Sequence, residues 1–197
     1  QAVSSTAVEA AAYSARLFTA LGPATSFFLY DALPHYSVGD AWPANTVGVS
    51  YQLELGAVLH ALNASMTESG VPLHGYWADC PYEYSRDYPN ATHPFPPGSG
   101  YQKIAAAVRL VHGLGLLMGK TFNSQAGGQT SDAAFYQGTM ADVAAVAAVI
   151  PHLTNGSDLD MKMVETWYSH PAEAVPETDK YTSSFTALAA FTKWQGA

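Results

Sequence analysis

Four apolar, strand-like runs along this chain each end in polar and aromatic residues. The runs lie at residues 27–31, 73–79, 116–123 and 161–168. Each is followed by a stretch whose apolar positions recur with helical spacing, so the pattern predicts parallel strands alternating with helices. The carboxyl ends of parallel strands meet at one edge of a sheet, where α/β proteins bind small molecules. We therefore expect the polar ends of the runs to gather on one rim.

The segments around these runs predict the helices. An alanine-rich helix is expected first, ended by Gly22-Pro23, and Gly70 and Ser131 are expected to cap later helices. The predicted helices cover residues 3–21, about 49–69, 101–114, 132–150 and 182–195, and the predicted strands cover 26–31, 72–79, 116–123 and 159–165.

The connections that leave the strands are longer than those that enter them. Residues 80–100 form the longest connection and contain five prolines, and loops of this length usually have a function. The asymmetry predicts an α/β fold, a parallel-stranded (β/α) barrel or partial barrel with four strand–helix units preceded by a helix. A doubly wound sheet is the alternative.

Chain length limits how much of a barrel can form. An eight-stranded barrel needs about 250 residues, and this chain has 197. We expect one domain over residues 1–197. The helix at its start favours the interpretation that this domain is the carboxyl-terminal part of a larger barrel. An open four-stranded sheet and a half barrel completed by a partner chain are the other arrangements, since an uncovered parallel edge invites pairing.

Composition narrows the classes of function. The chain is 48% hydrophobic and 12% charged, which predicts a folded domain. Its net charge is −8 and Lys and Arg do not cluster, so nucleic acid is not an expected partner. No apolar run approaches the ~20 residues of a membrane span. Nucleotide motifs and histidine pairs at helical spacing are absent from the sequence, so no cofactor or metal is expected.

Three of the five asparagines begin glycosylation sequons. They are Asn63, Asn90 and Asn155, and this proportion favours an extracellular protein or one in the secretory pathway. Unmodified surface asparagines are the alternative. Cys80 is the only cysteine, so no internal disulfide supports the extracellular interpretation.

Two segments place a carboxylate among aromatic rings at the end of a strand. They cover residues 76–83 and 164–171. Aromatic rings stack on sugar faces, while carboxylates bind hydroxyl groups or transfer protons, so the combination suits carbohydrate.

On these residues the chain resembles the (β/α)8-barrel glycoside hydrolases. The resemblance rests on four successive strand ends: Tyr30-Asp31, Trp77-Ala78-Asp79, Lys120-Thr121-Phe122-Asn123 and Glu165-Thr166-Trp167-Tyr168. It implies a secreted carbohydrate-active enzyme in which Asp79 and Glu165 are the acid and the nucleophile or base, with Asp31 in reserve. A carboxyl separation of about 5–5.5 Å would indicate retention of stereochemistry, and about 6.5–9.5 Å inversion.

Further residues are expected to contact an oligosaccharide or polysaccharide. The aromatic and polar candidates are Tyr30, Tyr76, Trp77, Asn123, Gln125, Trp167, Tyr168 and His170.

Strand alternation leaves the direction of Glu165 open. If Met163 and Glu165 share one face, Lys162 turns toward the helices at a cost; otherwise Lys162 faces the lumen and Glu165 turns away.

A second function class competes with the enzyme. A non-catalytic extracellular glycoprotein would keep the same frame to bind glycan or to assemble into a larger structure. A polysaccharide lyase is disfavoured, because few lysines or arginines lie near the strand ends to neutralise a uronate.

Overall fold

The computed structural model describes residues 2–44, 53–87 and 98–172. The helix expected over 182–195, the start of the helix expected from about residue 49, and Asn90 lie outside these residues.

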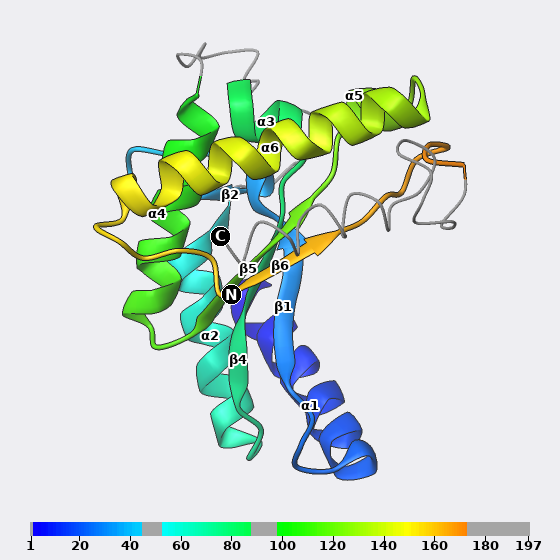
Figure 1. The fold of residues 1–197 in the computed structure, drawn as a ribbon. Helices are drawn as coiled ribbons and strands as arrows, with labels where there is room; N and C mark the ends of the chain where they lie inside the picture. Colours follow the sequence, from blue (N-terminus) through cyan, green and yellow to red (C-terminus); the bar gives the residue numbers. More distant parts are fainter. Residues whose placement is uncertain (1, 45–52, 88–97, 173–197) are drawn as a thin grey trace.

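Four parallel strands form the main sheet, in the order in which they occur along the chain (Figure 1). They are β1 (Phe27–Ala32), β4 (Leu73–Asp79), β5 (Leu117–Phe122) and β6 (Met161–Val164). Because the strand order does not reverse, right-handed crossovers place the connecting helices on the same face, whereas a doubly wound sheet carries helices on both. The expected parallel α/β sheet is confirmed, and the described strands do not close a barrel.

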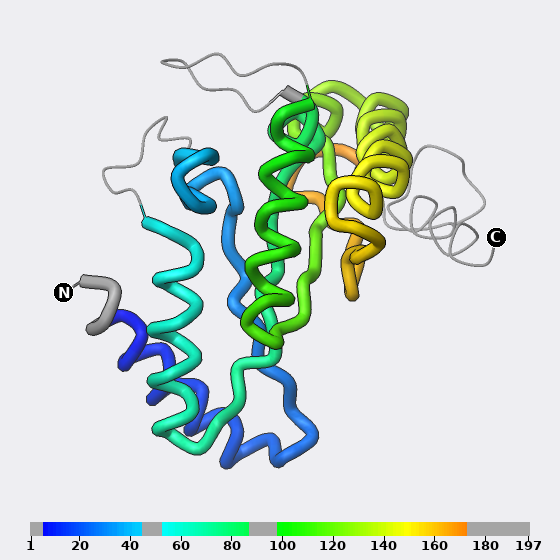
Figure 2. The backbone as a smooth tube through the Cα atoms, turned by 90° about the vertical axis from the view of Figure 1, so that its left-hand side faces the viewer, coloured from blue at the N-terminus to red at the C-terminus, as the bar shows by residue number. Residues whose placement is uncertain are grey.

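The long helices pack side by side on this face. They are α1 (Ala2–Leu21), α2 (Leu55–Glu68), α4 (Ser99–Gly113) and α6 (Asp132–Leu153). Each contacts the next, and Figure 2 shows α2 and α4 side by side, with α4 in front of the strands. The buried side chains between the sheet and the helices form one hydrophobic cluster that includes Leu59, Ile104, Val108, Met118 and Val146.

Two predicted helix caps are confirmed. Gly70 ends α2 with φ of +73°, a left-handed conformation that favours glycine. Before α6, the Ser131 Oγ accepts a hydrogen bond from the backbone N–H of Ala134 at 3.2 Å, so the hydroxyl satisfies one of the first free amides of the helix.

The second helix begins later than its pattern predicts. Glu54 is extended, with φ −89° and ψ 124°, and its carboxylate accepts a hydrogen bond from Ala57 N at 2.6 Å. Just before this cap, β3 (Leu53–Glu54) pairs in parallel with β2 (Tyr36–Ser37). The carboxylate of Glu54 therefore sets the start of α2, a role that the apolar spacing does not reveal.

The long loops contain short helices that the sequence pattern misses. These are η1 (Leu33–His35), α3 (Tyr82–Asp87) and α5 (Gln125–Gly128). The carboxylate of Glu83 in α3 accepts hydrogen bonds from the Ser124 hydroxyl at 2.8 Å and from Gln125 N at 3.0 Å. One acid thus fixes α3 against the start of α5.

An ion pair lies inside the core. Lys120 on β5 and Asp142 on α6 are 2.6 Å apart, and both side chains are 0% exposed. Lys120 also donates to the carbonyl oxygen of Cys80 at 2.7 Å. By length and composition alone α6 could cross a membrane, but here its buried Asp142 holds it against the sheet.

Candidate functional site

The sheet face opposite the helices carries aligned polar and aromatic side chains. Tyr30, Trp77 and Gly119 share one row of the register, and Asp79 and Thr121 share the next row toward the carboxyl ends. Because side chains alternate along a strand, these residues point away from the face that holds Lys120 and the core. We call Tyr30, Trp77, Asp79, Thr121 and Glu165 the rim site.

Two aromatic rings cover this face where the next strand has a glycine. A Cβ on Gly119 would lie 2.8 Å from Cδ2 of Trp77, and one on Gly75 would lie 2.7 Å from the Phe28 ring. The two rings meet edge to face with centroids 6.2 Å apart. Trp77 Nε1 also donates to the Thr121 hydroxyl at 3.1 Å, so the indole is fixed in place.

A hydrogen bond joins the two outer strands across the rim site. The Tyr30 hydroxyl donates to Oε2 of Glu165 at 2.8 Å. In a flat sheet three strand spacings of about 4.8 Å would separate β1 from β6 by about 14 Å. A direct bond between side chains over this span requires them to converge above the sheet, as on the inside of a curved sheet.

The direction of Glu165 is settled by its neighbour. Lys162 is in register with Lys120 on the helix face, and its Nζ pairs with Asp158 at 2.8 Å while its side chain is only 6% exposed. The ion pair offsets the cost of burying the ammonium group. Glu165 therefore faces the rim, and the alternative in which Lys162 occupies this face is wrong.

Asp79 has an environment that favours its protonated form. Burial raises the pKa of Asp79 above its ordinary value, and the charge of Asp31 acts in the same direction. The side-chain amide of Asn123, which donates to Asp79 Oδ1 at 3.3 Å, and the charge of Lys120 oppose this rise in pKa. A carboxyl of this kind holds its proton to higher pH than an exposed aspartate.

Tyr30 lies near both carboxylates, because its hydroxyl is bonded to Glu165 and it is in register with Trp77, two residues before Asp79 on the neighbouring strand. Burial raises the pKa of Tyr30 to about 12, and the charges of Asp79 and Glu165 both contribute to the increase. One phenol therefore interacts electrostatically with both carboxylates. The structure brings Asp79 and Glu165 to the same end of the same sheet face.

Asp31 and Tyr76 belong to the other side of the sheet. Asp31 is in register with Ala78 and accepts hydrogen bonds from the Tyr36 hydroxyl at 2.6 Å and from Ala32 N at 2.7 Å. Tyr76 is fully buried and its hydroxyl donates to the carbonyl oxygen of Asp31 at 3.1 Å. Tyr76 is therefore not a sugar platform, because neither face of its ring reaches solvent.

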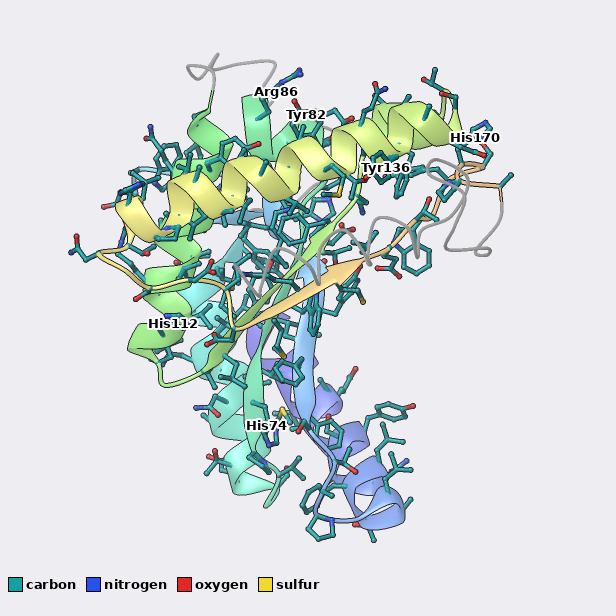
Figure 3. All side chains as sticks on the ribbon, in the orientation of Figure 1. His74, Tyr82, Arg86, His112, Tyr136 and His170 are labelled. Carbon is teal, nitrogen blue, oxygen red and sulfur yellow. The ribbon has the colours of Figure 1, made fainter. Side chains whose placement is uncertain are left out.

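Asn123 and His170 have structural partners, and Gln125 lies in the loop after β5. Asn123 is fully buried, so it positions Asp79 instead of contacting a ligand. Gln125 is half-buried at the start of α5. His170 pairs with Asp132, and Figure 3 shows it beside the first turn of α6.

The loop after β6 holds the last two aromatic candidates. Trp167 is exposed, whereas Tyr168 is half-buried with its ring packed on Gly128. Burial also raises the pKa of Tyr168, and the charges of Asp79 and Glu83 add to this effect.

Sequence reasoning missed Thr121, Gly119 and Gly75 as parts of this face. The available signal was a glycine in the neighbouring strand, which leaves room for a large ring to lie flat.

Among the described residues, no group of three or more His, Cys, Asp or Glu side chains could hold a metal ion.

No family model, curated protein or solved structure matches the chain. Fold and site therefore define its class on their own: an α/β protein with a parallel sheet and with carboxylates and aromatic rings at the carboxyl ends of the strands. An inference about function depends on the residues of the rim site.

Proposed function

We propose that this protein is a secreted carbohydrate-active enzyme, a glycoside hydrolase with the rim site as its active centre. The sheet would then be part of a (β/α) barrel, with the rim site on its inner wall. The observation that carries the proposal is that Tyr30, whose hydroxyl is bonded to Glu165, lies one register row from Asp79, so that both carboxylates lie at the same end of the same sheet face.

The environments of the two carboxylates suit different roles. Glycoside cleavage needs one carboxyl that protonates the leaving oxygen and one ionised carboxylate at the anomeric carbon. Asp79 is the proton donor in this proposal, because burial raises its pKa. Glu165 is the nucleophile or the base that activates water, and the Tyr30 hydroxyl orients it.

Trp77 supplies a surface for the sugar. One side of its indole lies over Gly119 and its Nε1 is bonded to Thr121, which leaves the half-buried ring held without rotamer freedom. A fixed ring next to an acid offers stacking to an apolar sugar face while the carboxylates engage hydroxyl groups. Bound oligosaccharide or polysaccharide is therefore the proposed partner.

Substitution of the two carboxyl groups tests this function. We expect Asp79→Asn and Glu165→Gln each to lower kcat for hydrolysis of a neutral polysaccharide by about 10³-fold or more, while the thermal midpoint by circular dichroism changes little. Asp40→Asn is the matched control, because Asp40 is an exposed carboxylate in the first loop, and it should keep full activity. Near-normal hydrolysis by both rim variants would reject the proposal.

Secretion and glycosylation belong to the same proposal. Asn155 is exposed just after α6 and Asn63 is half-buried on α2, so the described sequons lie at the molecular surface. An oligosaccharyl chain at these positions would not obstruct the rim site, since both come from the helix layer.

A non-catalytic glycoprotein is the second candidate, and one observation favours it. Within the described part of the chain, β1 and β6 each pair with a strand on one side only. Unpaired parallel edges are places where a partner chain could complete the barrel. Glycan binding by the wild-type protein without any hydrolysis, equal in the Asp79→Asn variant, would favour this candidate over the enzyme.

A further inference from the structure

Trp167 is a large apolar side chain that folding leaves in solvent. It is 67% exposed, although it directly precedes Tyr168, whose ring packs on Gly128. Most of its apolar surface therefore stays in water instead of contributing to the hydrophobic core. Exposure alone does not mark a ligand contact, since single exposed apolar side chains are common on protein surfaces.

The loop that carries Trp167 is held by its own hydrogen bonds. The Thr166 hydroxyl donates to the carbonyl oxygen of His170 at 2.8 Å and accepts from Tyr168 N at 3.2 Å. These bonds close the loop around the tryptophan, so a preformed turn presents the indole.

Further bonds attach the same loop to α5 and α6. His170 N donates to the carbonyl oxygen of Gly128 at 3.0 Å, and Ala172 N donates to Asp132 Oδ1 at 3.1 Å. The exposure of Trp167 therefore does not come from a loosely attached segment. Because the backbone of the loop is already held, little backbone entropy is lost when a ligand stacks on the indole.

Trp167 lies close to the rim site along the chain. It follows Glu165 by two residues, and two residues of extended chain span at most about 7 Å. A ligand whose reacting sugar meets Glu165 would therefore place its next unit within reach of the loop that carries Trp167.

Charge around the rim indicates what kind of unit this is. Among the described residues, the lysines of β5 and β6 and the histidine of the loop after β6 have acidic partners, the pairs being Lys120 with Asp142, Lys162 with Asp158, and His170 with Asp132. The rim site itself contributes two carboxyl groups, Asp79 and Glu165. An anionic sugar would meet like charge here, whereas a neutral sugar would not.

We propose that Trp167 forms an outer subsite that stacks on a second sugar ring, so that the substrate is a chain of uncharged sugars. This inference rests on the proposed function, because it places the reacting sugar at Asp79 and Glu165. It adds the substrate class, a neutral oligosaccharide or polysaccharide, and excludes both small glycosides of a single sugar and uronate polymers as preferred substrates.

The dependence of activity on chain length tests the subsite. The wild-type protein, Trp167→Ala and Tyr13→Ala are compared on neutral gluco-, xylo- and manno-oligosaccharides from disaccharide to hexasaccharide. Tyr13 on α1 is 63% exposed and far from the rim in the sequence, so it is the matched control. We expect Trp167→Ala to lower kcat/KM on the longer chains on the order of 10-fold and to leave aryl monoglycosides unchanged. Tyr13→Ala should match the wild type.

Binding to the inactive Glu165→Gln variant gives a second readout, measured by calorimetry. The affinity should rise with chain length in Glu165→Gln and lose this rise in Glu165→Gln/Trp167→Ala. An equal effect of Trp167→Ala at every length, or tighter binding of oligogalacturonate than of neutral chains, would overturn the outer subsite and leave the proposed function intact. Absence of both binding and hydrolysis in the wild type would overturn the proposed function as well.

Discussion

Lys103 on α4 is a buried lysine that holds the first long loop. Its side chain is 1% exposed, and its Nζ donates to the carbonyl oxygens of Tyr36 at 2.6 Å and Pro43 at 3.3 Å. Burial lowers its pKa to about 7. Tyr36 in turn bonds to Asp31, so one lysine supports the loop beside the rim.

This lowered pKa predicts that stability rises with pH. Between about pH 7 and the ordinary lysine pKa of about 10.4, the unfolded chain binds a proton that the folded chain does not, so the free energy of unfolding increases with pH. We expect the wild type to gain up to about 2 kcal/mol between about pH 7.5 and about pH 9.5 relative to Lys103→Met, measured by urea denaturation. The same pH dependence in both proteins would contradict the assignment.

At the residue scale, the sequence predicts which types of residue reach the strand ends but not which way each points. Tyr76 and Trp77 are adjacent and aromatic, yet Tyr76 is fully buried in the core and Trp77 lies on the opposite face. Alternation relates neighbours to each other only, and a tertiary contact has to fix the absolute direction. Lys162 shows this, because its pairing with Asp158 decides the direction of Glu165.

At the element scale, β5 determines how Trp77 lies. Gly119→Ala would place a Cβ 2.8 Å from the indole, closer than van der Waals contact, so the ring must shift and its bond to Thr121 weakens. We expect a loss of about 1–3 kcal/mol in the free energy of unfolding and a change in the near-ultraviolet circular dichroism of tryptophan. Gly113→Ala in α4 is the matched control, because nothing lies within 4 Å of its Cβ position. Equal behaviour of both variants would show that the glycine does not position the ring.

Strands and long helices are predictable here because their apolar period extends over many residues. The four strands appear near their expected positions, and Ser131 caps α6 as expected. The pattern does not predict the short helices α3 and α5, because six and four residues are too few to show a period. Glu83, which joins them, is recognisable only from its contacts.

At the scale of the whole molecule, the strand order places the helices on one face of the sheet, so the two faces carry different kinds of side chain. One sheet face packs on the helices and carries the buried pair of Lys120 and Asp142, and the other carries the rim site. The sequence predicts the parallel sheet from its repeated units, but it cannot set the curvature of that sheet. The hydrogen bond from Tyr30 to Glu165 joins residues 135 positions apart, and no local pattern encodes such a distance.

The pair of Lys120 and Asp142 fastens the sheet to the helix layer, and its two charges depend on each other. Lys120→Met leaves the fully buried Asp142 carboxylate without its partner, so we expect the free energy of unfolding to fall by about 3–5 kcal/mol in urea denaturation. Replacing both residues, as Lys120→Met/Asp142→Leu, removes the uncompensated charge and should restore most of that loss. A double variant as unstable as Lys120→Met would show that the charge of Asp142 is not the cause, and that the bond from Lys120 to Cys80 O carries the stability instead.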